Sequence, residues 1–120
     1  MITTHNILLL PNSTGTAVID INNIVRIEAI SNYSKLFFAN TSTGGRKTLV
    51  VAKVLKWFDE LLSDKGFIRI HRSHLINISC INSYNNNNRH KIILQNQEQI
   101  NISRRKRSSI IKRLAIMPAA

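Results

Sequence analysis

Cysteine is almost absent from this chain, and its scarcity excludes two kinds of site. Cys80 is the one cysteine among 120 residues, so no internal disulfide can form. It has no Cys or His neighbour at metal-ligand spacing, and we interpret it as a small core residue.

The N-terminus lacks a signal-peptide pattern, and no apolar run approaches the roughly 20 residues that span a bilayer. We therefore expect a cytoplasmic protein without a membrane segment.

Acidic residues are also scarce, which makes the chain strongly basic. Six Asp and Glu stand against 17 Lys and Arg, a formal net charge of +11. Most of the basic residues, but only Asp64 and Glu98 among the acidic ones, follow residue 60. This balance favours a polyanionic partner, nucleic acid or an anionic membrane, although a non-specifically sticky basic surface explains it about as well.

Catalysis has no candidate site in a chain with so few carboxylates. No two of them form a recognisable acid–base or metal motif. His71 and His74 are three residues apart but lack further zinc ligands, and no glycine-rich phosphate loop is present. We expect no enzyme activity, no cofactor and no metal. The carboxylates concerned are Asp20, Glu28, Asp59, Glu60, Asp64 and Glu98.

Aromatic residues make up only 6% of the chain. Proteins that bind single-stranded RNA usually expose aromatic side chains for base stacking. Here Phe37, Phe38, Trp57 and Phe58 fall in expected core elements. A general RNA-binding module is therefore disfavoured but stays open, as does a basic protein-interaction domain.

What the chain does contain is a series of short strand patterns at roughly ten-residue spacing, with 43% hydrophobic residues for a core. This spacing predicts antiparallel β-structure in a single domain, residues 1–120. A run of asparagines at 85–88 predicts a hairpin turn. We expect strands at 6–10, 17–21, 24–30, 35–39, 47–51, 67–71, 75–78, 81–84, 90–95 and 99–103.

Two segments show helical periodicity. Residues 52–62 place Leu55, Phe58 and Leu62 on one face, and Gly66 follows as a C-terminal cap. A second helix is expected from 104 to about 115, with Ile110, Ile111 and Leu114 on one stripe and Ser103 as the N-cap.

The second helix begins with an unfavourable charge pattern. Arg104, Arg105, Lys106 and Arg107 stand at the positive end of the helix dipole, where each cation costs about 0.3–1 kcal/mol. A bound phosphate would remove this conflict, whereas a solvated basic run is the alternative interpretation. Residues 67–77 also alternate apolar and basic side chains at the period of a half-buried strand.

These segments carry a family resemblance. Residues 27–34, 55–62, 67–73, 75–77 and 102–105 resemble, in order and spacing, the LytTR domain of bacterial transcriptional regulators. The resemblance covers about residues 6–114 and leaves a short tail at 115–120. It implies a mainly β fold of small antiparallel sheets with one interposed helix and a short C-terminal helix. It also implies that loops, rather than a recognition helix, enter the major grooves of duplex DNA.

The resemblance also assigns DNA contacts. Base contacts fall on Ser34, Arg72 and Arg105; the planar fork of arginine matches guanine O6 and N7. Arg69 and His71 are possible supporting residues, with a salt-bridged strand arginine and a packed, loop-bonded histidine as the alternatives. For the loop that carries Ser34, the alternative is an ordinary hairpin in which Tyr33 packs against a neighbouring residue. Sugar-phosphate contacts are expected from Asn32, Tyr33, Lys35, Ser73, Ser103, Arg104, Lys106, Arg107 and Ser108.

Two features depart from the family pattern. Ala52 stands where a serine or threonine commonly caps the interior helix. A receiver domain often accompanies such modules, so we expect either a stand-alone regulator or a segment of a longer one, controlled in that case by a receiver domain or sensor kinase. With one copy of each reading loop, we expect two monomers on repeated half-sites.

Overall fold

The computed structural model describes residues 6–12, 14–39, 47–85 and 90–116. It confirms the expected mainly β fold, in which every paired strand is antiparallel. The strands are β1 (Ile7–Asn12), β2 (Gly15–Asp20), β3 (Ile24–Ile30), β4 (Tyr33–Phe38), β5 (Thr48–Val51), β6 (Phe67–His71), β7 (His74–Asn77), β8 (Ile81–Asn85), β9 (Lys91–Leu94) and β10 (Gln99–Asn101). The helices are α1 (Leu55–Leu62) and α2 (Arg107–Ile116), with short 3-10 turns at Ile21–Asn23, Ser63–Lys65, Ile78–Cys80 and Arg104–Lys106.

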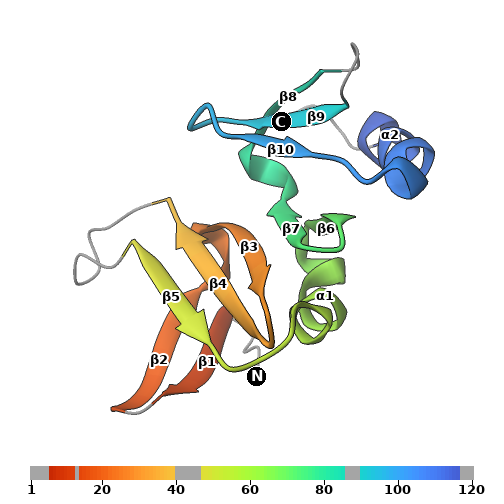
Figure 1. Ribbon diagram of the computed structural model, residues 1–120. Coiled ribbons are helices and arrows are strands. Elements are labelled where there is room, and N and C mark those ends of the chain that lie inside the picture. The colour runs from red at the N-terminus through yellow and green to blue at the C-terminus, as the bar shows by residue number, and fades with distance from the viewer. Residues whose placement is uncertain (1–5, 13, 40–46, 86–89, 117–120) are drawn as a thin grey trace.

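Three sheets form the molecule. The central sheet has the order β5-β4-β3-β7-β6, β1 pairs with β2, and β8–β10 form a three-stranded sheet. In Figure 1 the three-stranded sheet and α2 lie at the top of the view and the β1–β2 hairpin lies at the bottom. The central sheet therefore has a separate layer to cover each of its faces.

Strand alternation in the central sheet builds one core on each face. Phe67 and Leu75 belong to the cluster that includes Phe58 of α1 and residues of β1 and β2. Their neighbours Ile68 and Ile76 belong to the cluster formed with β9, β10 and α2. Each fully buried side chain of this size contributes about 1.5–3 kcal/mol relative to exposure. Because successive side chains of β6 and β7 point to opposite faces, these two strands contribute to both cores and so join the layers.

The interior helix begins later than the sequence predicts. Residues 52–54 form a turn in which Lys53 N–H donates to the Val51 carbonyl at 2.8 Å, and α1 begins at Leu55. The N-cap is therefore Val54, not Ala52, and it too provides no side-chain hydrogen bond. The helical face is as expected, since Leu55, Phe58 and Leu62 are buried. Gly66 follows in the left-handed conformation, with φ of 87°.

The C-terminal helix differs in two details. Its first turn, Arg104–Lys106, is a 3-10 turn, and Ser103 occupies the N-cap position without a side-chain hydrogen bond. Ile110 is buried, but Ile111 is 43% exposed and does not share its stripe. Consecutive helical residues point about 100° apart, so only one of the two can face the core. Leu114, four residues after Ile110, packs against that core.

The β3–β4 hairpin is tighter than expected. Its turn consists of Ser31 and Asn32, with Ser31 at a φ of 55°, and β4 begins at Tyr33 rather than Lys35. Strand pairing with β3 and β5 extends β4 toward the turn, because Ala29 faces Ser34 and Ser34 faces Val51. The expected asparagine hairpin lies mostly outside the described residues; Asn85 ends β8.

Candidate nucleic-acid interface

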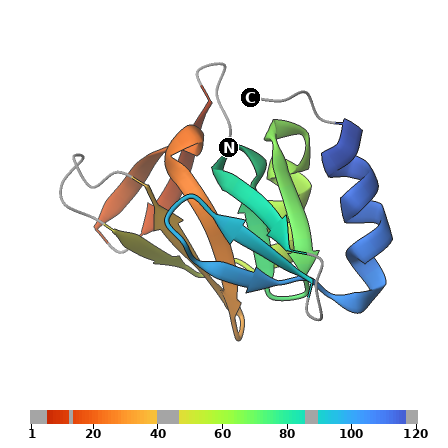
Figure 2. The same cartoon turned by 90° about the horizontal axis from the view of Figure 1, so that it is seen from above.

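The three connections predicted to contact DNA lie at the same end of the strands of the central sheet, and so form a row along one border of that sheet. They are the β3–β4 turn (residues 31–32), the β6–β7 turn (residues 72–73) and the β10–α2 connection (residues 102–106), and we call this the loop edge. Ala29 N–H donates to the Ser73 carbonyl at 2.9 Å, and Ser103 N–H donates to the Ile70 carbonyl at 2.9 Å. Figure 2 shows all three along its lower margin. Antiparallel pairing and these two bonds bring together segments more than 70 positions apart.

The order of strands sets the spacing along this edge. Neighbouring strands lie about 4.8 Å apart, so the ends of β4 and β6, three steps apart, are separated by roughly 14 Å. The β10–α2 connection lies beyond β6, to which it is bonded. The loop edge is therefore long enough to face more than one phosphate strand of a duplex.

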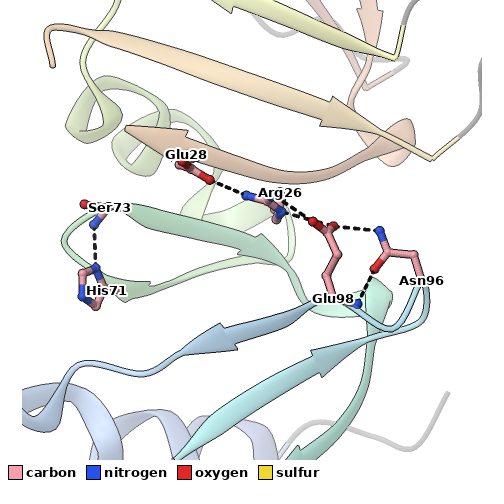
Figure 3. Close-up of polar contacts among 6 residues, drawn as sticks. All are labelled: Arg26, Glu28, His71, Ser73, Asn96 and Glu98. Carbon is pink, nitrogen blue, oxygen red and sulfur yellow. Dashed lines mark hydrogen bonds and ion pairs between the residues drawn. The ribbon is translucent and has the colours of Figure 1, made fainter. Parts of the chain in front are cut away.

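Two side chains of β6 form hydrogen bonds with the backbone of the β6–β7 turn. Arg69 donates from Nη2 to the Arg72 carbonyl at 2.6 Å and from Nε to the His71 carbonyl at 3.4 Å. His71 Nδ1 accepts from Ser73 N–H at 3.1 Å (Figure 3), which places the ring proton of the neutral form on Nε2. Arg69 and His71 therefore hold the turn, Arg69 through carbonyl groups rather than a salt bridge, and their role in supporting DNA contacts stays a prediction.

The turn and the β10–α2 connection present exposed cations. Arg72, Arg104 and Arg105 are exposed, and among the described residues none of them forms an ion pair with a carboxylate. Ser73 and Ser103 are half-buried, whereas Ser108 is exposed. Free guanidinium groups on short, braced connections are well suited to contact an anionic ligand.

Two other predicted contacts are partly engaged in the fold. Lys106 Nζ donates to the Arg69 carbonyl at 3.3 Å, which joins the 3-10 turn before α2 to β6. Burial lowers the pKa of Lys106, and the neighbouring Arg69 cation adds to that effect. Arg107 is half-buried, and its Nε is buried without a hydrogen-bond partner among the described atoms. Both cations are thus less free than Arg104 and Arg105.

Ser34, predicted as a base contact, faces into the fold. Its side chain has 0% exposure, and its hydroxyl donates to the Lys53 carbonyl at 2.7 Å. Because β4 begins at Tyr33, strand alternation turns Ser34 inward and Tyr33, which is 50% exposed, outward. In this conformation the Ser34 hydroxyl is already bonded and turned inward, and its assignment as a base contact stays a prediction that this geometry does not support. Asn32 is exposed and Lys35 is half-buried, with Nζ 5.2 Å from the ring centroid of Phe37.

Behind the loop edge, an arginine joins two sheets. Arg26 of β3 is buried and contacts Glu28 at 2.8 Å and Glu98, in the β9–β10 turn, at 2.8 Å. Asn96 Nδ2 donates to Glu98 Oε1 at 2.8 Å (Figure 3), and the Arg26 guanidinium lies 3.7 Å from the ring centroid of Phe37. Sequence reasoning missed this group, because residues 26 and 98 carry no local pattern that links them.

The charges in this group shift each other's pKa. Burial, the largest influence on Arg26, opposes its charge, but the hydrogen bonds that Arg26 donates to Glu98 and Glu28, together with their negative charges, outweigh it and raise its pKa. The hydrogen bond from Arg26 lowers the pKa of Glu98. The pair is thus held in its ionised form, which keeps the β9–β10 turn attached to the central sheet.

His74 lies next to this group. Its Nδ1 is buried without a hydrogen-bond partner among the described atoms, and its ring centroid is 5.3 Å from that of His71. Burial lowers the pKa of His74 against the opposing pull of Glu28, and the charges of His71 and Arg26 lower it further. His74 is therefore a neutral packing residue of β7 at neutral pH.

Other chemistry has little support in the part of the chain that is described. That part contains no group of three or more His, Cys, Asp or Glu residues arranged to hold a metal ion. Within the same residues, no helix is long and apolar enough to cross a membrane. Cys80 packs against the second core, and burial raises the pKa of its thiol.

Lys53 is an exposed cation close to the loop edge that sequence reasoning did not single out. It lies in the β5–α1 connection, is exposed, and is joined to β4 by the Ser34 hydrogen bond. The expected helix start at Ala52 would have placed Lys53 on a helical face. Only the pairing of Ser34 with Val51 shows that β5 ends on this side of the sheet.

Comparisons with known proteins agree with this architecture. No curated protein sequence matches the chain. A solved structure of the LytTr DNA-binding domain of a Bacillus cereus protein, described as a methyl-accepting/DNA response regulator, matches with a TM-score of 0.72 at 19% sequence identity. The match covers 93% of this chain and 98% of that one, and it shows that the two share a fold. The family model of the LytTr DNA-binding domain matches residues 14–115, and the chain therefore belongs to the LytTr DNA-binding domain family.

Proposed function

We propose that this domain binds duplex DNA sequence-specifically, with the loop edge placed against adjacent major grooves. The single observation that carries the proposal is the alignment of the β3–β4, β6–β7 and β10–α2 connections along one edge, with Arg72 and Arg105 exposed on two of them. Membership of a DNA-binding family supports the choice of partner. In a transcriptional regulator, this binding would direct the protein to particular promoters.

Arg72 and Arg105 are the base-reading residues in this proposal. A guanidinium can donate two parallel hydrogen bonds to guanine O6 and N7, which is worth about 1–3 kcal/mol of discrimination per base. Arg69 and His71 hold the backbone of the Arg72 turn, so that its side chain is presented from a fixed position. Pre-organisation of this kind reduces the entropy lost on binding.

The remaining contacts position the duplex. We assign them to exposed or half-buried polar residues on or next to the loop edge: Asn32, Tyr33, Lys35, Ser73, Ser103, Arg104, Lys106, Arg107 and Ser108. A phosphate bound at the 3-10 turn that precedes α2 would also lie at the positive end of the helix dipole. The four successive cations there, unfavourable in the free protein, become favourable when the phosphate is bound.

A bacterial regulator that binds chromosomal DNA works in the cytoplasm, and we infer that location here. Two monomers on repeated half-sites, and control by a receiver domain or sensor kinase, stay predictions of the family resemblance. RNA binding is less well supported, because Phe58 is fully buried and Phe37 is covered by Arg26. Such aromatic residues cannot stack on bases.

Selection of bound duplexes from a random pool tests the proposal. We expect a short shared motif, and we expect duplexes that carry it to displace a labelled probe far better than random duplex or single-stranded RNA. Recovery of no common sequence, with random duplex competing equally well, would leave only a non-specific basic domain. Stronger competition by RNA would favour the RNA-binding alternative, and indifference to all nucleic acid would favour protein interaction.

A further inference from the structure

The β5–α1 connection continues the loop edge beyond the β3–β4 turn. Ser34 faces Val51 in the β4–β5 ladder, so β5 ends on the same side of the central sheet as the turn that begins β4. The chain then passes through residues 52–54 before α1. The order of connections along the edge is therefore β5–α1, β3–β4, β6–β7 and β10–α2.

Lys53 is held in this connection by both of its backbone groups. Its carbonyl accepts from the Ser34 hydroxyl at 2.7 Å, and its N–H donates to the Val51 carbonyl at 2.8 Å. Ser34 has no exposed surface, so water cannot readily replace this bond. The backbone position of Lys53 is thus fixed relative to β4, although the residue lies between a strand and a helix.

The side chain of Lys53 is left available. Lys53 is exposed and forms no ion pair with a carboxylate in the described part of the chain, and its Nζ lies 5.2 Å from the ring centroid of Trp57. An exposed cation–π contact of this kind is weak, about 0.5–1 kcal/mol. Lys56, one turn further along, is different because its Nζ pairs with Glu60 Oε1 at 3.9 Å.

We propose that the β5–α1 connection is a fourth DNA-contacting element, in which Lys53 binds a backbone phosphate and Ser34 is the positioning residue. This proposal rests on the proposed function, since the loop edge must face DNA. Lys53 lies at the outer end of the edge, with the β3–β4 turn between it and the arginine of the β6–β7 turn. A compact ammonium on a flexible stem suits a phosphate contact rather than base reading.

The first test compares Lys53→Gln with Lys56→Gln on one selected duplex over a range of salt concentrations. Loss of a phosphate contact should weaken binding severalfold, equally for specific and random duplexes, and reduce the log–log salt slope by about one unit. Lys56→Gln, which removes the same charge a turn away, should leave that slope near the wild-type value. An unchanged slope in Lys53→Gln, or an equal loss in both variants, would overturn the proposal.

The second test concerns Ser34. We expect Ser34→Ala to release the Lys53 carbonyl and produce part of the loss seen in Lys53→Gln, and to add no further loss when the two changes are combined. Full additivity would show that Ser34 does not act through Lys53. Arg105→Ala on the same duplex separates the two proposals: if it loses binding while Lys53→Gln does not, only the fourth element is wrong. If neither variant loses binding, the loop edge does not face DNA.

Discussion

Arg26 and Glu98, 72 positions apart, form a bidentate ion pair between the central sheet and the β9–β10 turn. Nη2 of Arg26 lies 2.8 Å from Oε2 of Glu98, and Nε lies 3.3 Å from Oε1. Arg26 is 7% exposed, so it depends on these partners for its solvation. The pair links the central sheet to the three-stranded sheet, whose last strand leads into the β10–α2 connection.

Removal of the Glu98 carboxylate should destabilise the fold. Glu98→Ala leaves a buried guanidinium with only Glu28, and hydrogen bonds to charged groups contribute about 1.5–3 kcal/mol. We expect a loss in this range in chemical denaturation. Glu60→Ala is the matched control, because its pair with Lys56 is exposed and should change stability by less than about 1 kcal/mol. Similar losses in both variants would mean that the Arg26 pair contributes no more than a surface pair.

Stability should fall in acid in two separate windows. Burial lowers the pKa of His74 below 6.5, so the unfolded state binds its proton more tightly than the folded state. The His74 contribution is complete above pH 6.5 and is lost as the pH falls through the folded pKa. Unfolding free energies at several pH values for wild type and His74→Gln should show a smaller slope in the variant. Equal slopes would show that His74 titrates alike in both states.

The lower window belongs to Glu98. Its pKa is lowered from 4.5 chiefly by the hydrogen bond from Arg26, so its contribution is present above 4.5 and is lost as the pH falls through the folded pKa. Glu98→Gln should therefore flatten the stability curve below about pH 4.5 and leave the His74 window in place. A change confined to the higher window would contradict this assignment.

Loss of either reading arginine should affect discrimination rather than stability. Arg72→Ala and Arg105→Ala remove exposed side chains, and we expect melting temperatures near wild type. Each variant should lose about 1–3 kcal/mol of discrimination at one position of the site. Binding to a set of single-base variants of the selected duplex measures this. Retention of full selectivity, or a marked drop in melting temperature, would give that arginine a structural role instead.

The cations at residues 104–107, around the start of α2, should not be equivalent. Arg104→Gln should weaken specific and random duplexes alike and reduce the salt slope by about one unit, with the selectivity ratio unchanged. Lys106→Gln should also lower stability, because Lys106 Nζ donates to the Arg69 carbonyl. Arg107→Gln is expected to resemble Lys106→Gln, since Arg107 is half-buried. A change of preferred base in any of these variants would show that the residue contacts a base rather than a phosphate.

The size of the domain limits the site that one copy can read. With a radius of gyration of 14.3 Å, it can reach two adjacent major grooves on one face of a duplex. We expect two monomers on half-sites separated by near-whole multiples of about 10 bp. A shift of one half-site by about half a turn should abolish joint binding but preserve each single-site affinity. A monomer that binds one half-site as tightly as the repeat would show that the domain acts alone.

The sequence by itself was sufficient for most of the elements. Period-two alternation located the strands, and Gly66 marked the end of the first helical segment with the left-handed conformation it was expected to adopt. The same alternation placed Arg72 in an exposed turn. These features depend on residues within a few positions of one another, which is why a linear pattern can reveal them.

Tertiary structure decided the orientation of Ser34 and the partners of Arg26. In the sequence, residues 31–34 look like one loop, but pairing with β5 extends β4 to include Tyr33 and Ser34. The Ser34 hydroxyl then donates to the Lys53 carbonyl instead of to solvent. Arg26 and Glu98 meet only because two sheets stack. Hydrogen bonds and ion pairs between distant segments depend on how layers pack, and local periodicity carries no record of that packing.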